Sequence, residues 1–278
     1  MGSLIHPAIH PAIHPTAIID SSAVLAPGVS VGAYAVIGPE VSLGEGTWVG
    51  PHAVIMGPSV IGRDNKIFQF ASVGEGPQDK KFSGEKTRLI MGDRNVIREC
   101  ATIHRGTIQD RQETKIGSDN LFMAYSHVAH DCILGDHNIL VNSATLAGHV
   151  HLGDHVIISA FCAVHQFCSI GSSSFLSHAS LVSKDVLPYM MVTGADQPTV
   201  CGLNVEGLKR RGFSPECIEL LRRAYKIIFR ESLRAVEALD KLKELKTELE
   251  AQNLEQKSIQ AISLLIQSLE SSERGILR

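Results

Sequence analysis

Two histidines and an aspartate stand close together in the stretch HVAHDC, residues 127–132. His127 and His130 are three residues apart, and Asp131 directly follows the second histidine. An imidazole beside a carboxylate can act as a general base, because the carboxylate holds the ring in one tautomer. The same side chains could also ligate a metal ion or decorate a surface turn. The backbone that carries them decides between these three chemistries.

A six-residue repeat with one large aliphatic residue per hexad organises most of the chain. This period fits neither an α-helix nor an alternating strand. It is typical of short strands stacked as a parallel β-helix, in which three hexads make one triangular coil of about 18 residues. Glycine often follows the aliphatic residue, and we expect it to supply the backbone angles of the corners. The series slips once, by one residue after Ile103, and its members are Ile13, Ile19, Leu25, Val31, Ile37, Leu43, Val49, Ile55, Ile61, Ile67, Val73, Met91, Ile97, Ile103, Ile116, Phe122, Val128, Leu134, Leu140, Leu146, Leu152, Ile158, Val164, Ile170, Leu176 and Val182.

The pattern resembles the left-handed parallel β-helix of the hexapeptide-repeat transferases. We therefore expect an all-β left-handed β-helix over residues 1–200 and a small α-helical C-terminal domain over 201–278. Two polar interruptions predict loops that project near 74–90 and 104–115, and such loops often carry binding residues. The helical part has a start signal, with Ser214 as N-cap and Pro215 at the first helical position.

The repeat also places the histidines. Successive coils of a parallel sheet lie about 4.8 Å apart, so position n should stack under n+18. Gly148 then stacks over His130 and Gln166 over Gly148, with His149 and His165 beside them. We predict one polar patch with a recess at Gly148, which favours His130 as a general base oriented by Asp131. A surface cluster without chemistry is the alternative; we expect no metal site, because no carboxylate-rich ligand set accompanies the histidines.

Composition narrows the classes of partner. The formal net charge of −3 makes nucleic acid an improbable partner, and no apolar run approaches the about 20 residues of a membrane span. The six cysteines form no CxxC pair, so we expect reduced thiols. The first C-terminal helix and its approach are rich in lysine and arginine, which suits either a solvated face or a docking surface for an acidic partner.

Several motifs together resemble the bacterial-type UDP-N-acetylglucosamine O-acyltransferases, over roughly residues 15–278. They are NKIFQFASVGEGPQDKKFSGEKTRLIMGDRNVIRECATIHRGT, HVAHDC, LAGHV, AVHQFCSIG and NVEGLKRRGF. The resemblance implies a homotrimer that moves a (3-hydroxy)acyl chain from the thioester of acyl carrier protein to the 3-hydroxyl of UDP-N-acetylglucosamine, the first step of lipid A synthesis. It implies no further cofactor, and it makes the basic C-terminal helices the docking face for acyl carrier protein.

The resemblance also implies roles for individual residues. His130 matches the general base, Asp131 the residue behind it, and Gly148 the backbone amide that stabilises an oxyanion. The position that matches the family's acyl-length ruler is His178, where an imidazole in place of glycine should shorten the accepted chain or change its pose. The positions that match substrate-binding residues are Gln78, Asp79, Lys81, His127, His149, His165, Gln166, Asn204, Glu206, Arg210 and Arg211.

Two other functions remain open at this point. One is the sibling N-acyltransferase of the same pathway, against which stand the short N-terminus and the GLKRRGF segment. The other is a trimeric β-helical scaffold without activity, which would be expected to lose the His130–Asp131 pair. The compartment we expect is the cytoplasm for a bacterial protein, or a mitochondrion or plastid for a eukaryotic one whose targeting peptide has been removed.

Overall fold

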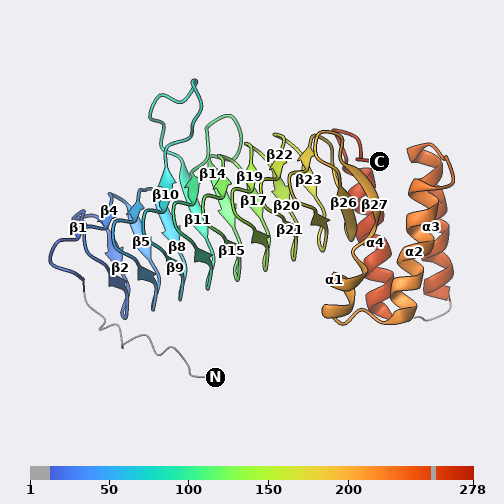
Figure 1. Ribbon diagram of the computed structural model, residues 1–278, viewed down its shortest axis with the longest axis horizontal. Helices are drawn as coiled ribbons and strands as arrows, with labels where there is room; N and C mark the ends of the chain where they lie inside the picture. The colour runs from blue at the N-terminus through green and yellow to red at the C-terminus, as the bar shows by residue number, and fades with distance from the viewer. Residues whose placement is uncertain (1–12, 252–254) are drawn as a thin grey trace. The chain divides into compact units, whose positions relative to one another are not determined.

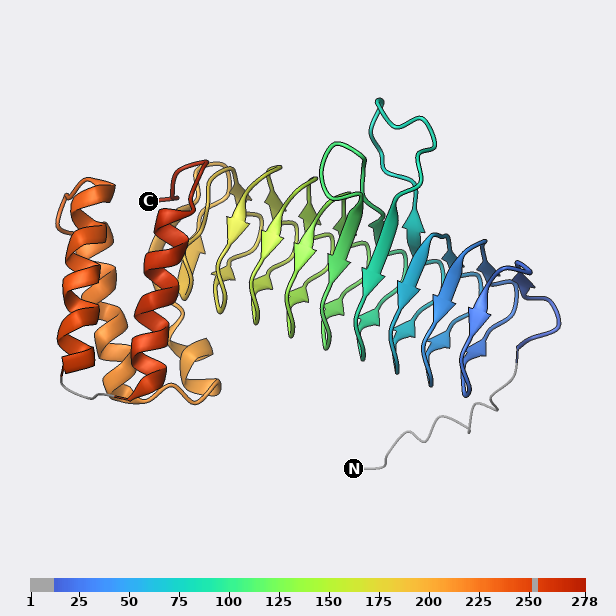
Figure 2. The ribbon, with the colours of Figure 1, turned by 180° about the vertical axis from the view of Figure 1, so that it is seen from behind.

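The computed structural model describes residues 13–251 and 255–278, which form a left-handed parallel β-helix and four α-helices (Figures 1 and 2). The predicted fold class is confirmed. The first twelve residues of the predicted β-helical domain lie outside the described residues. The described chain forms two compact units: a first unit that runs to His137 and includes residues 141–143, and a second unit of residues 138–140 and 144–278.

The first unit is built from three parallel sheets, one on each side of the coils. The first sheet holds, in spatial order, β1 (Ile18–Ile19), β4 (Val36–Ile37), β7 (Val54–Ile55), β10 (Ser72–Glu75), β13 (Thr102–His104) and β16 (His127–Val128). The second holds β2 (Val24–Leu25), β5 (Val41–Leu43), β8 (Ser59–Ile61), β11 (Arg88–Met91), β14 (Glu113–Ile116) and β17 (Ile133–Leu134). The third holds β3 (Ser30–Val31), β6 (Trp48–Val49), β9 (Lys66–Ile67), β12 (Val96–Ile97) and β15 (Leu121–Phe122).

The strand register follows the coil length that the hexads predict. Ile19 pairs with Ile37, and Ile37 pairs with Ile55. From Val31 onward the aliphatic residue of each hexad is buried, as Ile55 and Ile67 illustrate, whereas Ile13 is 50% exposed. Burial of one such side chain stabilises the fold by roughly 1.5–3 kcal/mol, and this burial recurs in each hexad after the first ones.

The corners differ from what the sequence suggested. The residue with positive φ lies three places after the aliphatic one, as in Tyr34 (φ 56°) after Val31, and it is mostly not glycine. The glycine directly after the aliphatic residue is needed for space instead: a Cβ at Gly44 would lie 2.5 Å from the carbonyl carbon of Gly62 in the next coil. Our expectation that these glycines supply corner angles was therefore wrong, because close stacking of coils is the constraint.

A ladder of buried asparagines follows one corner of the first unit. The backbone N–H of Asn95 donates to Oδ1 of Asn65 at 2.8 Å, and that of Asn120 donates to Oδ1 of Asn95 at 2.9 Å. Nδ2 of Asn95 donates to the carbonyl of Gly117 at 3.0 Å. Each amide thus satisfies backbone groups of the next coil that no strand ladder reaches.

Two loops project from the first unit, between β10 and β11 (residues 76–87) and between β13 and β14 (residues 105–112), as Figure 1 shows. Arg105 joins them to the coils. Its guanidinium donates to the carbonyl of Gly57 at 2.6 Å and to that of Gly74 at 3.2 Å, and lies 5.8 Å from the ring centroid of Phe82. One cation therefore anchors both loops near the strands that carry the histidines.

The second unit consists of further coils followed by helices. One sheet holds β18 (Ile139–Leu140), β21 (Ile157–Ile158), β24 (Phe175–Leu176), β26 (Met190–Thr193) and, antiparallel to it, β27 (Thr199–Leu203). The other two hold β19 (Thr145–Leu146), β22 (Ala163–Val164) and β25 (Leu181–Val182), and β20 (His151–Leu152) with β23 (Ser169–Ile170). The helices are α1 (Val205–Arg210), α2 (Pro215–Phe229), α3 (Ala235–Ala251) and α4 (Gln256–Glu270).

The predicted start of the helical bundle is confirmed. The Ser214 hydroxyl accepts a hydrogen bond from the backbone N–H of Cys217 at 3.1 Å, with Pro215 at the first helical position. Leu221, Ala224 and Ile228 lie on the buried face of α2, as their three-and-four spacing predicts. Among the described residues, no helix has the length and apolar character that crossing a membrane would require.

Replacement of Asn95 by leucine should destabilise the first unit by at least about 2 kcal/mol, because it leaves the buried N–H of Asn120 and the carbonyl of Gly117 unpaired. Urea unfolding of Asn95→Leu against the native protein measures this free energy. The matched control is Asn142→Leu, at an exposed turn position of the same unit. Equal unfolding free energies for the two variants would contradict the role given to the ladder.

Candidate active site

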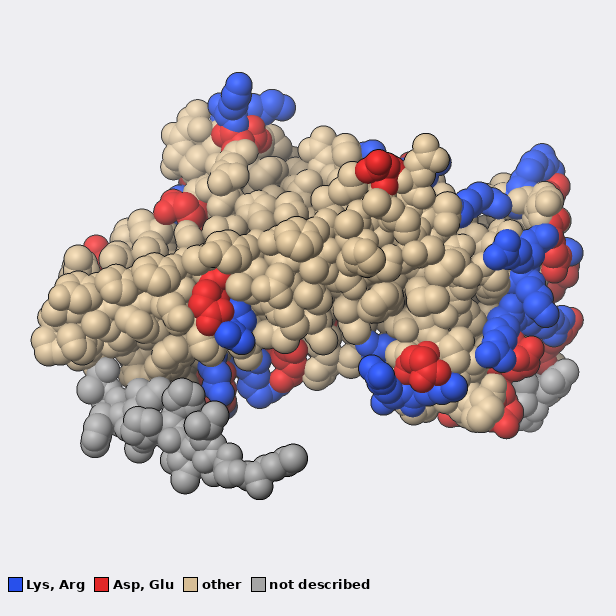
Figure 3. Space-filling view, in the orientation of Figure 1, with Lys and Arg blue, Asp and Glu red and all other residues tan. Residues whose placement is uncertain are grey.

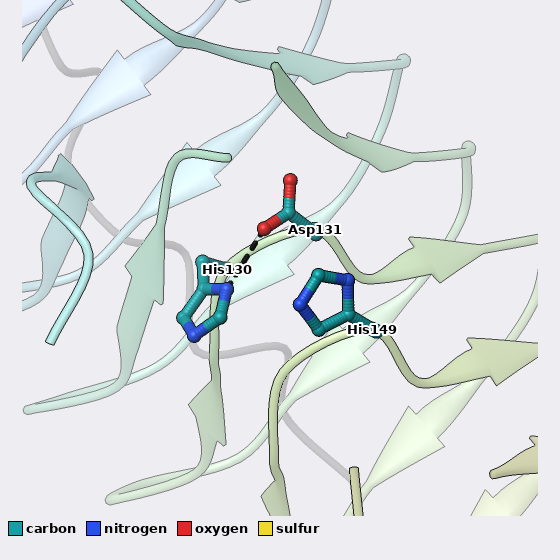
Figure 4. A group of neighbouring side chains, drawn as sticks. All are labelled: His130, Asp131 and His149. Carbon is teal, nitrogen blue, oxygen red and sulfur yellow. Dashed lines mark hydrogen bonds and ion pairs between the residues drawn. The ribbon is translucent and has the colours of Figure 1, made fainter. Parts of the chain in front are cut away.

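His130 and Asp131 follow β16 and form a hydrogen-bonded pair, which Figure 4 draws. Nδ1 of His130 lies 2.8 Å from Oδ2 of Asp131; the side chain of His130 is 16% exposed and that of Asp131 0%. An ionised carboxylate only accepts hydrogen bonds, so Nδ1 carries the ring proton and Nε2 has a lone pair. The arrangement is that of a general base with an orienting acid.

The local backbone and the second loop together hold Asp131. Its φ of 59° is a left-handed conformation that aspartate tolerates better than most residues. Its backbone N–H donates to the hydroxyl of Thr114 at 2.9 Å. Its carboxylate accepts from the backbone N–H of Thr107 at 2.9 Å and from the Thr107 hydroxyl at 2.6 Å. Sequence reasoning missed Thr107 and Thr114, because nothing in the sequence of the loop or of β14 singles out the residues that contact Asp131.

The environment of Asp131 favours an orienting role over metal ligation. Both carboxylate oxygens already accept hydrogen bonds, and Oδ2 is shared between Thr107 and His130. A metal ion would have to displace one of these contacts. The pair is therefore organised to fix an imidazole, as a carboxylate does in hydrolytic triads.

Two further imidazoles of the first unit lie beside this pair. Nδ1 of His127 is 2.7 Å from the hydroxyl of Thr102, on the neighbouring strand β13. The rings of His104 and His127 meet edge to face, with centroids 5.0 Å apart and an interplanar angle of 83°. His127 was predicted to line the site, whereas Thr102 and His104 were not.

Burial keeps these two imidazoles neutral. Desolvation, together with the nearby His127, lowers the pKa of His104 from 6.5 to about 4, although Glu75 acts in the opposite direction. Desolvation also lowers the pKa of His127, and His130 adds to the effect. Protonation of either ring near pH 7 is thereby disfavoured, because a positive charge would have to be buried away from water.

The predicted loop residues are placed by the structure on the loop of residues 76–87. Gln78 and Lys81 are exposed there, and Asp79 is half-buried. The carboxylate of Asp79 accepts from the backbone N–H of Lys81 at 2.9 Å, and its carbonyl accepts from the N–H of Phe82 at 3.0 Å. Asp79 therefore shapes the loop, while Gln78 and Lys81 leave their ends open to solvent.

A second set of predicted residues comes together in the second unit. The ring of His149 stacks on that of Phe167, with centroids 4.4 Å apart. The backbone N–H of Phe167 donates to the carbonyl of Gly148 at 3.2 Å, and Nδ1 of His165 lies 3.1 Å from the carbonyl of Gln166. Gly148, His149, His165 and Gln166 are thus neighbours. That they also adjoin His130 stays a prediction.

The third set surrounds α1. Asn204 caps this helix, accepting from the N–H of Gly207 at 3.1 Å, and its Nδ2 donates to the carbonyl of Ser173 at 2.9 Å. Arg211 donates to the carbonyl of His155 at 2.9 Å, and its second terminal nitrogen is buried without a partner among the described residues. Glu206 is exposed and pairs with Lys209 at 2.9 Å, and Arg210 is exposed as well.

His178, the predicted ruler, lies on the exposed turn between β24 and β25. No described contact of its ring fixes its role. Its place beside a bound acyl chain therefore stays a prediction.

The neutral state of His104 predicts a pH dependence of stability. Below about pH 6.5 the unfolded chain binds a proton at this imidazole, while the folded protein keeps it neutral down to about pH 4. The contribution is fully present above pH 6.5 and is lost as the pH falls to 4, by about 3 kcal/mol at most. In His104→Phe, the unfolding free energy should fall less steeply over this range than in the native protein. Urea unfolding at pH 7, 5.5 and 4.5 tests this, with the exposed His178→Phe as matched control; identical slopes for His104→Phe and the native protein would refute it.

Comparisons with known proteins identify the relatives of this chain. Residues 185–277 match the family model described as Udp N-acetylglucosamine O-acyltransferase, domain 2, and residues 113–148 match that of the bacterial transferase hexapeptide, six repeats. The acyl-[acyl-carrier-protein]–UDP-N-acetylglucosamine O-acyltransferase of Herminiimonas arsenicoxydans is 51% identical over 266 residues, which is 95% of this chain and 98% of that protein. The protein of the same name from Pseudomonas entomophila (strain L48) is 49% identical, over 94% of this chain and 97% of its own.

Solved structures give the same result. The structure from Acinetobacter baumannii has 50% sequence identity and a TM-score of 0.89, and covers 96% of this chain and 99% of its own. The UDP-N-acetylglucosamine acyltransferase of Francisella novicida has 42% identity and a TM-score of 0.90, with 96% and 94% covered. With identities near one half along nearly its whole length, the chain belongs to the UDP-N-acetylglucosamine O-acyltransferase family.

Proposed function

We propose that this protein transfers a (3-hydroxy)acyl group from the thioester of acyl carrier protein to the 3-hydroxyl of UDP-N-acetylglucosamine, the first step of lipid A synthesis. The names of its relatives state both substrates of those proteins. The observation that carries the proposal to this chain is the His130–Asp131 pair, whose 2.8 Å contact orients an imidazole with Nε2 unprotonated. A scaffold without activity would not require this pair.

In the proposed reaction His130 is the general base. Its Nε2 takes the proton of the sugar hydroxyl while the oxygen attacks the thioester carbonyl, a contribution typically of about 10²–10⁴-fold. The imidazolium that forms is stabilised by the buried carboxylate of Asp131. Collapse of the tetrahedral intermediate breaks the C–S bond, and the thiolate leaves with the proton from His130. The products are the ester and the free thiol of acyl carrier protein, so no cofactor beyond the thioester is needed.

The remaining predicted residues receive proposed roles in binding. The backbone N–H of Gly148 would donate to the oxyanion, as preorganised amides do in acyl transfer. Arg211 suits the diphosphate, because its guanidinium has a buried nitrogen without a partner among the described residues. Asn204, Glu206 and Arg210 would lie near the uridine and the phosphates. The residues proposed to contact the sugar and the acyl chain are Gln78, Asp79, Lys81, His127, His149, His165 and Gln166.

We assign the docking of acyl carrier protein to the basic helices of the second unit. Figure 3 shows lysine and arginine side chains gathered over the helical region. Arg222 and Arg223 are half-exposed on α2, and their partners, Glu219 and Glu248, lie at the surface as well. Such exposed ion pairs are worth little, so an acidic partner can exchange them at low cost. We further propose that the protein acts as a homotrimer. The expected cytoplasmic compartment stays a prediction.

Replacement of His130 by alanine should lower kcat by about 10²–10⁴-fold, because the attacking hydroxyl loses its base. Asp131→Asn should also lose activity by at least about 10²-fold, because a neutral amide no longer stabilises the imidazolium. Acyl transfer from 3-hydroxyacyl carrier proteins of several chain lengths to UDP-N-acetylglucosamine is the assay. The exposed His14→Ala is the matched control.

Retention of full activity by folded His130→Ala would contradict the assignment of His130 as the general base. If the native protein transfers no acyl chain of any length to this sugar nucleotide, the proposed substrates are wrong, and the scaffold function becomes the favoured alternative. Transfer to a glucosamine amine in place of the hydroxyl would instead indicate the sibling N-acyltransferase.

Replacement of His178 by glycine should move the preferred acyl chain toward greater length, because an imidazole occupies space that glycine leaves open. The measurement is the ratio of kcat/KM values for a long and a short 3-hydroxyacyl carrier protein. Each methylene that a pocket admits or excludes is worth roughly 1–3 kcal/mol, so the ratio should change by tenfold or more. An unchanged ratio would remove His178 from its proposed role as ruler.

A further inference from the structure

Two of the proposed substrate contacts on the loop of residues 76–87 belong to one compact turn. The carboxylate of Asp79 accepts a hydrogen bond from the backbone N–H of Lys81 at 2.9 Å. The carbonyl of Asp79 accepts another from the backbone N–H of Phe82 at 3.0 Å. Because both bonds close within four residues, the place of Phe82 also determines where the backbones of Asp79 and Lys81 lie.

Phe82 is the side chain through which this turn meets Arg105. The ring of Phe82 is half-buried, and its centroid lies 5.8 Å from the central carbon of the Arg105 guanidinium. That separation is within the about 6 Å over which a cation is attracted to an aromatic face. Both side chains adjoin Gly76, where an added Cβ would lie 3.3 Å from Cε1 of Phe82 and 3.8 Å from a terminal nitrogen of Arg105. The beginning of the loop therefore passes directly beside this pair.

The guanidinium of Arg105 is itself fixed by the backbone of the coils. One terminal nitrogen donates to the carbonyl of Gly57 at 2.6 Å and to that of Gly74 at 3.2 Å. An arginine side chain only donates hydrogen bonds and a carbonyl only accepts them, so the direction of both contacts is unambiguous. Gly57 follows β7 and Gly74 lies in β10, and these two strands are hydrogen-bonded neighbours. The paired strands therefore hold the cation in one place beside the loop.

We propose that Arg105 and Phe82 are positioning residues, which hold the loop of residues 76–87 in the conformation that presents its polar side chains to the sugar nucleotide. These side chains are those of Gln78, Asp79 and Lys81. The inference rests on the proposed function for the identity of the ligand. Order in the loop is a property of the protein without substrate, so it can be tested separately.

The first experiment measures the rate at which trypsin cuts the loop in the absence of substrate. Phe82→Ala and Arg105→Met should be cut there at least about tenfold faster than the native protein, because proteolysis requires a segment to open locally. Phe82→Tyr should be cut at the native rate, because it keeps the ring. The masses of the fragments locate the cut, and the loop offers sites after Lys80, Lys81 and Lys86.

Arg111→Met is the matched control for Arg105→Met. Arg111 lies on the same loop of residues 105–112 as Arg105, and its side chain is 55% exposed. Its replacement should leave both the cleavage of the loop of residues 76–87 and the kinetic constants unchanged. A native rate of loop cleavage in either Phe82→Ala or Arg105→Met would overturn the proposal.

The second experiment is kinetic. In Phe82→Ala, KM for the sugar nucleotide should rise roughly tenfold while kcat stays within about threefold of the native value, because a displaced loop weakens binding and leaves the base in place. Phe82→Tyr should restore the native KM. A fall in kcat at unchanged KM in Phe82→Ala would exclude a role in positioning a binding loop.

Arg105 needs a separate criterion, because Thr107, two residues further along the chain, contacts the carboxylate of Asp131. Arg105→Met should raise KM as Phe82→Ala does, and the double variant should raise it no further, because the two residues act through one contact. If Arg105→Met instead lowers kcat at unchanged KM, its effect runs through Thr107 and Asp131, and the positioning role of Arg105 is wrong.

The two experiments fail separately. If the native protein does not act on these substrates, the cleavage rates still decide whether Arg105 and Phe82 order the loop. If transfer is observed but the variants keep native cleavage rates and a native KM, the positioning role is wrong while the proposed function stands.

Discussion

Close stacking of one coil on the next is the constraint on which the rest of this structure depends. A parallel sheet separates strands by about 4.8 Å, so every side chain meets its equivalent in the neighbouring coil. Aliphatic residues such as Ile55 and Val73 then form continuous buried columns. Glycine after the aliphatic residue is needed because a Cβ there would collide with the next backbone, as at Gly44. Asn65, Asn95 and Asn120 turn the same stacking into a ladder of buried hydrogen bonds.

The candidate site depends on this stacking, because the sheet fixes the distances between the side chains that it carries. Thr102 meets His127 because the two are register partners, and the rigid sheet fixes their distance. The projecting loop of residues 105–112 then adds what the regular coils cannot supply, because Thr107 reaches the carboxylate of Asp131 with both its N–H and its hydroxyl. The regular coils and the projecting loop therefore both supply contacts around the His130–Asp131 pair.

The three imidazoles of the candidate site differ in their surroundings. Burial lowers the pKa values of His104 and His127, which keeps both rings neutral. His130 is hydrogen-bonded to a carboxylate that is itself fully buried and accepts from Thr107. Three neighbouring imidazoles therefore differ in their environments, which are set by burial and by one ion-pair partner rather than by residue type.

The sequence by itself determined the fold, and it identified His130 and Asp131 as the candidate general base and its orienting acid. The six-residue period predicts stacked coils, because one side chain in each hexad must be buried inside the coil. His130 and Asp131 are neighbours in the chain, so their contact can be expected without knowledge of the tertiary structure. The N-cap at Ser214 is equally local and was also predicted correctly. Only the tertiary structure decided which polar groups complete the site. Thr102, His104, Thr107 and Thr114 are distant in sequence from His130, and their positions depend on coil register and on the path of a loop, which no local pattern encodes. The function of the glycines likewise required the neighbouring coil, because close approach is a property of two segments and is absent from either one alone.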